Sequence, residues 1–453
     1  MQVQRSGVDG RVVVSGDGDG VVGHAGALLL SEVGDRLGLT AALAQRPAVL
    51  RHRRSAHDPG EVLRDVAVTL ADGGDCLSDL AVLRDQPGLF GEVASHATAW
   101  RTLERVAADP FGVDAVRAAR KTARAAAWAV SGGVPTVDGL VTVDVDATFV
   151  TAHSDKDQAA GTYKGTFGFY PLLAYLDRGD GTGEPLGGVL RPGNAGSNTV
   201  IDHDDVLTLV LDQLPTVPDE LPVLVRSDSA GASHGFVGAL RHEGVLFSVG
   251  FPVDERIRDA VTALPATAWV HARTQTGQRR DGAAVAELHD LDLPTWPHGT
   301  RVIVRREPLH PGAQASFLDA DGHRVTCFVT DQPDSDIAEL ERRHRAHARV
   351  EDRIRCAKDT GLRNLPFFDF ARNQVWMELV LTAQDLLAWT QLLTLDGPLA
   401  TAEPKTLRYR LLHTAARLVR HARRTHLRLQ RNWPWTPALV AAFTRARALP
   451  TTC

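Results

Sequence analysis

Apolar residues in the first part of the chain recur three and four positions apart, which is the spacing of short amphipathic helices. The clearest of these patterns cover residues 28–39, 76–84, 97–108 and 113–130. A further helix start is predicted at Asp58, because this N-cap residue is followed by Pro59 and, at the third helical position, by Glu61. We therefore predict a helical N-terminal domain over residues 1–131.

After this domain the periodicity changes to that of β-strands. Alternation over residues 141–150 is followed by two strand-like runs, a helix, a short apolar strand, a second helix and a last strand. These elements are expected at residues 168–176, 186–190, 199–214, 222–226, 233–243 and 245–251. Three strands, helix, strand, helix, strand is the order of an RNase H-like sheet. Residues 138–251 are thus predicted to form the first part of such a core.

The rest of the chain completes the predicted α/β fold. Residues 252–330 are irregular, with Pro, Gly and scattered strand patterns, which indicate a β-rich insertion subdomain. A long helix capped by Asp336 then forms the second part of the core over residues 331–372. Residues 373–453 are expected to be helical, including helices at 374–395 and 407–429. The fold class is an RNase H-like mixed sheet core with a β-rich insertion, flanked by helical N- and C-terminal regions.

Charge is distributed very unevenly along the chain. The formal net charge is -5, but residues 404–453 hold 11 Lys and Arg and no Asp or Glu, which leaves -16 for the rest. On the helix expected at 407–429, arginines recur at spacings of three and four, including Arg420 and Arg424. Because the opposite face lacks large aromatic residues, we favour DNA or a second protomer over a membrane surface as the partner of this cationic face.

Other features favour a soluble, cytoplasmic protein without an organic cofactor or a membrane partner. The N-terminus lacks the basic flank and apolar run of a signal peptide, and the apolar stretch 377–395 is interrupted by Glu378 and Asp385. The four cysteines lie too far apart for a zinc knuckle or a redox pair. A GxGxxG match at residues 18–23 is interpreted as a Gly-rich turn, since Asp19 would stand where a pyrophosphate must approach.

Acidic residues occupy strand positions that suit metal binding. Asp144 and Asp146 share one face of the strand at 141–150, because side chains alternate along a strand. Considered alone, this pair is better explained as ordinary strand carboxylates. Asp228 follows the apolar strand at 222–226 at its carboxyl end, where open α/β sheets bind ligands. The small residues after it leave space for a metal ion and its waters.

A polar stripe lies on the helix that follows Asp336. His344, His347, Glu351 and Lys358 stand at offsets of 0, 3, 7 and 14, which places them within about 60° of one another around a helix. By itself this stripe is equally consistent with a solvated helix face or with a zinc-binding pattern.

Taken together, these segments resemble the bacterial insertion-sequence transposases of the DDE class, in the branch with the signature Tyr-x2-Arg-x3-Glu-x6-Lys (YREK). The chain has His344-x2-His347-x3-Glu351-x6-Lys358, so Glu and Lys match in type and spacing, and Tyr and Arg are each replaced by His. Residues 146–148, 190–194 and 226–228 are similar to the family's first-aspartate motif, strand-three turn and second-aspartate motif.

The resemblance implies a cut-and-paste DNA transposase that hydrolyses the ends of a mobile element and transfers the 3′-OH strand into target DNA. Asp146, Asp228 and Glu351 would be the catalytic metal ligands for two Mg²⁺ ions, with Mn²⁺ able to substitute, and Asp144 would lie outside the triad. The expected partner is double-stranded DNA, both terminal inverted repeats and target, bound by a homodimer because two ends must be joined. The N-terminal helical domain is then expected to bind DNA.

The same resemblance suggests which residues contact DNA. His344, His347 and Lys358 are expected to do so through the signature, and Arg420 and Arg424 through the basic tail. Lys164 joins them because only five lysines occur among 50 basic residues, and a point charge on a flexible stem suits a phosphate. For Trp269 and Trp296 in the insertion, base stacking and core packing are both open.

Two alternatives follow from the histidine replacements and from the fold. One is a catalytically impaired, DNA-binding transposase relative, because a histidine is only partly charged near neutral pH. The other is an RNase H-like nuclease without joining activity.

Overall fold

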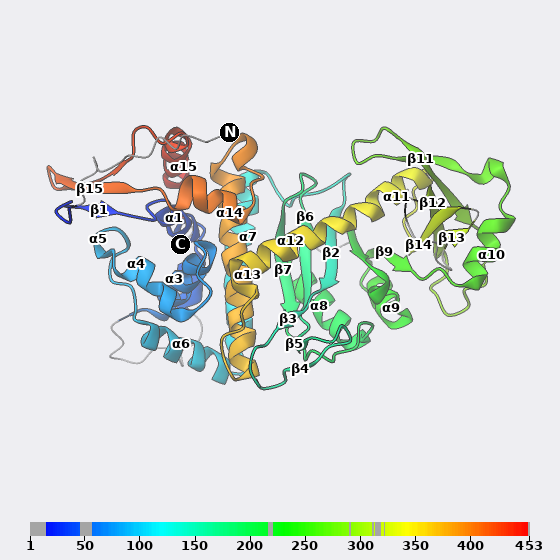
Figure 1. The fold of residues 1–453 in the computed structure, drawn as a ribbon, viewed down its shortest axis with the longest axis horizontal. Coiled ribbons are helices and arrows are strands. Elements are labelled where there is room, and N and C mark those ends of the chain that lie inside the picture. Colours follow the sequence, from blue (N-terminus) through cyan, green and yellow to red (C-terminus); the bar gives the residue numbers. More distant parts are fainter. Residues whose placement is uncertain are drawn as a thin grey trace, which may run out of the picture.

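A mixed β-sheet lies at the centre of the computed structural model, which describes residues 15–45, 57–215, 221–289, 291–309, 312, 319–320 and 322–451. A helical region stands at one end of the elongated molecule and a β-rich region at the other (Figure 1). Helix α13 (Phe370–Thr394) separates the helical region from the sheet, and α11 (Ile337–Arg345) and α12 (Arg349–Ala357) run from the β-rich region across the sheet towards α13 (Figure 1).

The middle of the sheet has the predicted RNase H-like order. Its strands in space are β7 (Gly183–Val189), β6 (Leu172–Asp177), β2 (Val141–Ala147), β8 (Val223–Ser227) and β9 (Leu246–Phe251). The first three pair antiparallel, whereas β8 is parallel to β2 and β9 is parallel to β8. Helices α8 (Val200–Gln213) and α9 (His234–His242) provide the crossovers that parallel strands require. This part of the fold prediction is confirmed.

The insertion extends the same sheet instead of forming one of its own. After α10 (Glu255–Ala263), it contributes β10 (Val270–Arg273), β11 (Arg279–Leu288), β12 (Arg301–Pro308), β13 (Asp319–Ala320) and β14 (His323–Thr330). Strand β14 pairs antiparallel with β9, so a 10-stranded sheet results. The expected strands of residues 252–330 are therefore present, and hydrogen bonds fix them to the core.

The long helix predicted after Asp336 is interrupted twice. Its start is confirmed, because the Asp336 carboxylate accepts a hydrogen bond from the backbone N–H of Glu339 at 3.2 Å. A 3-10 turn (Ala346–Ala348) separates α11 from α12, and a π turn (Lys358–Leu362) ends α12. His344 and Glu351 thus lie on two helical segments, not on one regular helix.

The helices from the two ends of the chain share one hydrophobic core. The N-terminal ones are α1 (Ala27–Arg36), α2 (Leu39–Gln45), α3 (Pro59–Ala71), α4 (Ala81–Arg84), α5 (Pro87–Phe90), α6 (His96–Ala108) and α7 (Gly112–Ser131). Their buried residues pack with those of α13 and α15 (Thr436–Ala448). The described helices before residue 132 and after residue 369 therefore contribute to one hydrophobic cluster, although the sequence analysis assigned them to different domains. The predicted N-cap is also confirmed, since Asp58 accepts from Gly60 N at 2.7 Å.

Helix α13 is buried along most of its length although it carries acidic residues. Glu378 and Asp385 are fully buried and pair with Arg120 of α7 at 3.0 and 2.8 Å. Arg124 adds a second contact to Asp385 at 2.8 Å. These pairs compensate the buried charges and tie α13 to α7. Within the described ranges, helices that combine the length and apolarity of a membrane span do not occur.

The prediction of a basic helix at residues 407–429 is wrong. After α14 (Pro404–Leu407) and a π turn (Arg408–Leu412), the chain forms an antiparallel hairpin of β15 (Ala416–His421) and β16 (Arg424–Leu429). Its two turn residues, Ala422 and Arg423, have φ of 48° and 64°, as a two-residue type I′ turn requires. Strand β1 (Val21–Val22) pairs with β15 and completes a three-stranded sheet (Figure 1).

Candidate active site

The three carboxylates predicted as metal ligands line one cavity of about 520 Å³. Asp146 is the next-to-last residue of β2, and Asp228 directly follows β8. These strands are parallel neighbours whose register pairs Val145 with Ser227, so the two aspartates come one step later at the same sheet edge. Glu351 reaches this edge from the first turn of α12. Strand pairing and helix crossing thus bring together residues that are far apart in the chain.

Mutual repulsion and burial act on the carboxylates. Burial raises the pKa of Asp146 to about 6, the negative charges of Asp228 and Glu351 add to this, and His347 opposes it. The guanidinium groups that line the cavity, Arg305 and Arg345, both pair with Glu341 instead, at 3.1 and 2.8 Å. In the described part of the chain, none of the three carboxylates has an ion pair with Lys or Arg. Such a set of hard oxygen donors suits divalent cations.

The carboxylate of Asp144 pairs with basic side chains of the protein. Its Oδ1 accepts from Arg226 Nε at 2.8 Å and contacts His347 Nδ1 at 2.9 Å, and its Oδ2 accepts from Arg226 Nη2 at 2.8 Å and Arg353 at 2.6 Å. Burial alone would raise the pKa of Asp144, but the Arg226 charge and the His347 contact hold it below its usual range. Neither oxygen is left for a metal ion, which separates Asp144 from Asp146.

The two histidines lie in the cavity wall with their Nδ1 atoms engaged inside the protein. His344 Nδ1 is 2.9 Å from Ser248 Oγ, and its ring stacks on Phe328 with centroids 4.2 Å apart. Burial lowers the pKa of His344 to about 3, so this ring is neutral near pH 7. At the position of the signature tyrosine, His344 is therefore an uncharged, stacked ring, whereas His347 at the arginine position pairs with Asp144. The DNA contacts expected of both stay predictions.

Two of the predicted DNA-contacting residues, Lys358 and Lys164, interact electrostatically with each other. Burial lowers the pKa of Lys358, the nearby charges of Arg363 and Lys164 lower it further, and Asp146 counteracts them. The Lys164 ammonium lies over the ring of Phe149, 5.4 Å from its centroid. The charge of Lys358 thus interacts with those of Asp146 and Lys164, whereas neither lysine lines the carboxylate cavity.

An aromatic cluster next to Lys164 escaped the sequence reasoning. Phe149 and Tyr170 stack at 4.4 Å, and Tyr163 packs edge-on against Phe149 at 5.2 Å while 71% of it is exposed. The cluster surrounds a small sheet of β3 (Val150–Thr151), β5 (Phe167–Phe169) and β4 (Ala160–Gly161) that follows β2. The sequence does contain a signal for this cluster. Two of the chain's four tyrosines, Tyr163 and Tyr170, lie within eight residues, and Lys164, one of few lysines, is next to Tyr163. An exposed ring next to a cation is a surface on which bases stack.

The two insertion tryptophans are engaged in packing. Arg306 lies over the Trp269 ring at 4.0 Å, and Trp296 meets the rings of His234 and Phe251 at 5.1 and 5.4 Å.

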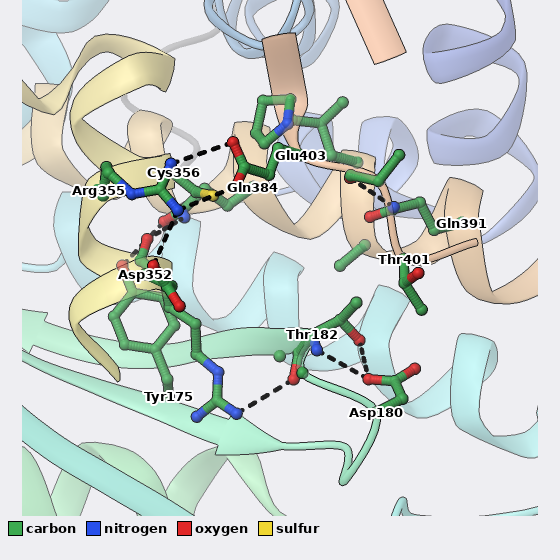
Figure 2. A pocket seen from close by; sticks show the side chains of 17 residues that line it. Tyr175, Asp180, Thr182, Asp352, Arg355, Cys356, Gln384, Gln391, Thr401 and Glu403 are labelled. Atoms are coloured by element: carbon green, nitrogen blue, oxygen red, sulfur yellow. Dashed lines mark hydrogen bonds and ion pairs between the residues drawn. The ribbon is translucent and has the colours of Figure 1, made fainter. Parts of the chain in front are cut away.

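A second cavity of about 250 Å³ lies at another face of α12 (Figure 2). Asp352 and Cys356 of α12 line it, together with Glu403 from the segment before α14. Arg355 pairs with Asp352 at 2.8 Å and with Glu403 at 2.9 Å (Figure 2). Asp352 is thus neutralised by an arginine, whereas its neighbour Glu351 faces the cavity of the aspartates.

The β15–β16 hairpin gathers cations on one face. Arg417 pairs across with Arg428, and His421 with Arg424, and all four are exposed. Leu418 and Leu427 on the opposite face pack towards Val22 and Leu89. Of the two arginines predicted to bind DNA, Arg424 belongs to the cationic face, and Arg420 points to the other side near the turn.

A comparison with protein families matches nearly the whole chain. The family model described as Transposase DDE domain group 1 covers residues 4–451. Among solved structures, the chain is similar to a piggyBac transposase in a synaptic complex with hairpin DNA, at 8% identity and a TM-score of 0.41, covering 86% of this chain and 79% of that one. A comparison with curated proteins returns no match.

Proposed function

Because the chain belongs to the transposase DDE domain group 1 family, we propose that it hydrolyses DNA at the ends of a mobile element and transfers the freed 3′-OH into target DNA. The observation that carries this proposal is the meeting of Asp146, Asp228 and Glu351 in one cavity without a lysine or arginine partner among the described residues. Neighbouring basic residues are instead committed to Asp144 or to Glu341. We propose these three carboxylates as the catalytic residues.

The donor set fits divalent cations. Three carboxylates share a partly buried site, and burial together with the charges of Asp228 and Glu351 raises the pKa of Asp146, so a cation there would relieve an unfavourable charge. Two Mg²⁺ ions, or Mn²⁺ in their place, would supply activation of a water and stabilisation of the leaving 3′ oxygen. Asp146, Asp228 and Glu351 would hold them, and hard oxygen donors leave positions for water and phosphate.

Other residues of the chain would position the DNA. Lys358 interacts electrostatically with Asp146 and with Lys164, and the ammonium groups of both lysines would contact phosphates that flank the reacting one. His347 is oriented by its contact with Asp144 and keeps its other ring nitrogen for the substrate. The cationic face of the hairpin, with Arg417, Arg424 and Arg428, would hold the DNA backbone outside the cavity. Joining two element ends implies a homodimer on double-stranded DNA.

A test needs purified protein, DNA that contains the element's inverted terminal repeats, and Mg²⁺. Strand cleavage at the repeat ends and joined products support the proposal. Cleavage without preference for the repeats indicates a nuclease without joining activity. The neutral state of His344 favours a second candidate, a catalytically impaired DNA-binding relative, for which repeat binding without nicking in either Mg²⁺ or Mn²⁺ is the expected result.

A further inference from the structure

Away from the carboxylate cavity, two histidines and an aspartate from three separate segments converge. His24 lies between β1 and α1, Asp72 follows the last residue of α3, and His413 follows the π turn before β15. One ligand atom from each lies within 4.8 Å of the others. His24 Nδ1 is 2.5 Å from Asp72 Oδ2, and His413 Nε2 is 3.3 Å from Asp72 Oδ1.

One oxygen atom of the Asp72 carboxylate accepts no hydrogen bond in this cluster. Its side chain is 4% exposed, and its Oδ1 accepts no hydrogen bond within the described residues. The nearest ring nitrogen, His413 Nε2, bonds to the backbone oxygen of Asp72 at 2.9 Å instead. The Oδ1 atom thus has an ion-pair contact with His413 at 3.3 Å but accepts no hydrogen bond from the described residues, and a bound cation would satisfy it.

Backbone contacts hold the segments of His24 and His413 together before any ligand binds. Ala25 N donates to Thr414 O and Gly26 N donates to Leu412 O, both at 3.0 Å. A Cβ at Gly26 would lie 2.1 Å from the Leu411 oxygen, so only glycine permits this close approach. His24 itself has a φ of 51°, which directs its side chain differently from an extended residue.

We propose that His24, Asp72 and His413 form a Zn²⁺ site. Two imidazoles with one carboxylate are a borderline-soft donor set that selects zinc over magnesium. Tetrahedral bonds of about 2.0–2.1 Å place ligand atoms roughly 3.3 Å apart, so ring rotations of the two partly exposed histidines bring the three atoms to that spacing. His24 and His413 are 33% and 39% exposed, which leaves the fourth position open to water.

The site would join the helical body to the hairpin sheet. Asp72 belongs to the end of α3, whereas His24 follows β1 and His413 precedes β15. Zinc would therefore fix the base of the hairpin, and its binding would replace the contact between His24 Nδ1 and Asp72 Oδ2. This site is independent of the carboxylate cavity and of the reaction proposed for it.

Zinc content and affinity of the full-length protein test the proposal. Protein stripped with a chelator is returned to Zn²⁺ in buffer with excess Mg²⁺, which occupies oxygen-donor sites. Bound zinc is then measured by mass spectrometry and by competition with a zinc indicator. We expect about one zinc per chain, and affinity at least about tenfold weaker in Asp72→Asn and in His413→Ala.

Two variants serve as matched controls. His421→Ala removes an exposed histidine of the same hairpin, and Cys76→Ser removes the thiol of a second group that could hold a metal, Asp75, Cys76 and Asp79. Both should bind zinc as the parent does. If Asp72→Asn does not fold, His24→Ala and His413→Ala decide. Absence of stoichiometric zinc from the parent, retention in the His variants, or loss in Cys76→Ser would each overturn the assignment.

Discussion

His347 Nδ1 lies 2.9 Å from Oδ1 of Asp144, which joins the segment before α12 to the buried middle of β2. The same carboxylate holds Arg226 and Arg353, and these two arginines also reach Asp177, each at 2.6 Å. A balanced charge cluster therefore lies directly beneath the open cavity. Two residues further along β2, Asp146 has no such partners among the described residues.

Asp144→Asn and Asp146→Asn should change stability in opposite directions. Loss of the Asp144 charge leaves Arg226 and Arg353 buried with half of their compensation, and a cost of about 3–5 kcal/mol in unfolding free energy is expected. Loss of the Asp146 charge removes repulsion, so metal-free Asp146→Asn should gain roughly 1–2 kcal/mol at pH 7.5. Thermal unfolding in chelator measures both, and equal signs would contradict this account.

The raised pKa of Asp146 also predicts how the stability of the metal-free protein depends on pH. The unfolded chain loses the Asp146 proton near pH 3.8 and the folded protein only near pH 6, so the contribution of Asp146 to stability falls as the pH rises between these values. Asp146→Asn should abolish that part of the decline, which parallel urea titrations across this range would show.

Asp228→Asn and Glu351→Gln should abolish strand cleavage while DNA binding persists. Each variant removes one of the proposed metal-holding charges, and losses on the order of 1,000-fold or more in the cleavage rate are expected. Asp352→Asn is the matched control, because this neighbour of Glu351 pairs with Arg355 outside the cavity. Single-turnover cleavage and gel-shift assays separate chemistry from binding. Undiminished cleavage by either site variant would remove the assignment.

His344 should make the protein less stable in acid. Below its ordinary pKa of 6.5 the unfolded chain binds a proton that the folded protein rejects until about pH 3, so stability falls as the pH drops through this window. From pH 7.5 to pH 5 the contribution of His344 to the unfolding free energy should decrease by about 2 kcal/mol, which the Asp146 contribution partly offsets. His344→Phe keeps a ring against Phe328 and should show a smaller pH difference in melting temperature. An unchanged difference would mean that His344 is charged in the folded state.

Arginines of the hairpin face should set the salt dependence of DNA binding. Replacing Arg424 or Arg428 with glutamine should lower the slope of log affinity against log salt by about 0.9 for each phosphate that the protein no longer neutralises. Arg256→Gln is the control, since this exposed arginine of α10 pairs with Asp254. Fluorescence anisotropy at several salt concentrations gives the slopes. Equal slopes for all variants would place the DNA elsewhere.

The candidate site was largely predictable because its parts follow local rules. Asp146 and Asp228 stand at the ends of apolar strands, and parallel pairing brings such ends together without further information. The caps at Asp58 and Asp336 predict helices from a few adjacent residues. The packing of Asp144 with Arg353 could not be foreseen, since it depends on where α12 crosses the sheet.

The hairpin was missed for a physical reason. Leucines and arginines at 411–431 fit spacings of three and four as well as two, and the turn lacks the Asn-Gly that usually marks a hairpin. Strand geometry is imposed there by β1, whose backbone pairs with β15 from the far end of the sequence. The pairing of β14 with β9 also joins segments that are distant in the sequence. For this reason the sequence analysis predicted the insertion as a separate subdomain.

The pairing of β1 with β15 also bears on how the protein is made. Asp19 and Arg417, which are hydrogen-bonded in the finished molecule, are 398 positions apart. At the usual pace of synthesis, the first strand waits roughly 20–80 s on the ribosome before its partner emerges. The sheet that holds the two aspartates is complete by residue 330, well before the hairpin exists. The nascent chain therefore forms the sheet edge of its candidate site before it has the hairpin face proposed to hold DNA.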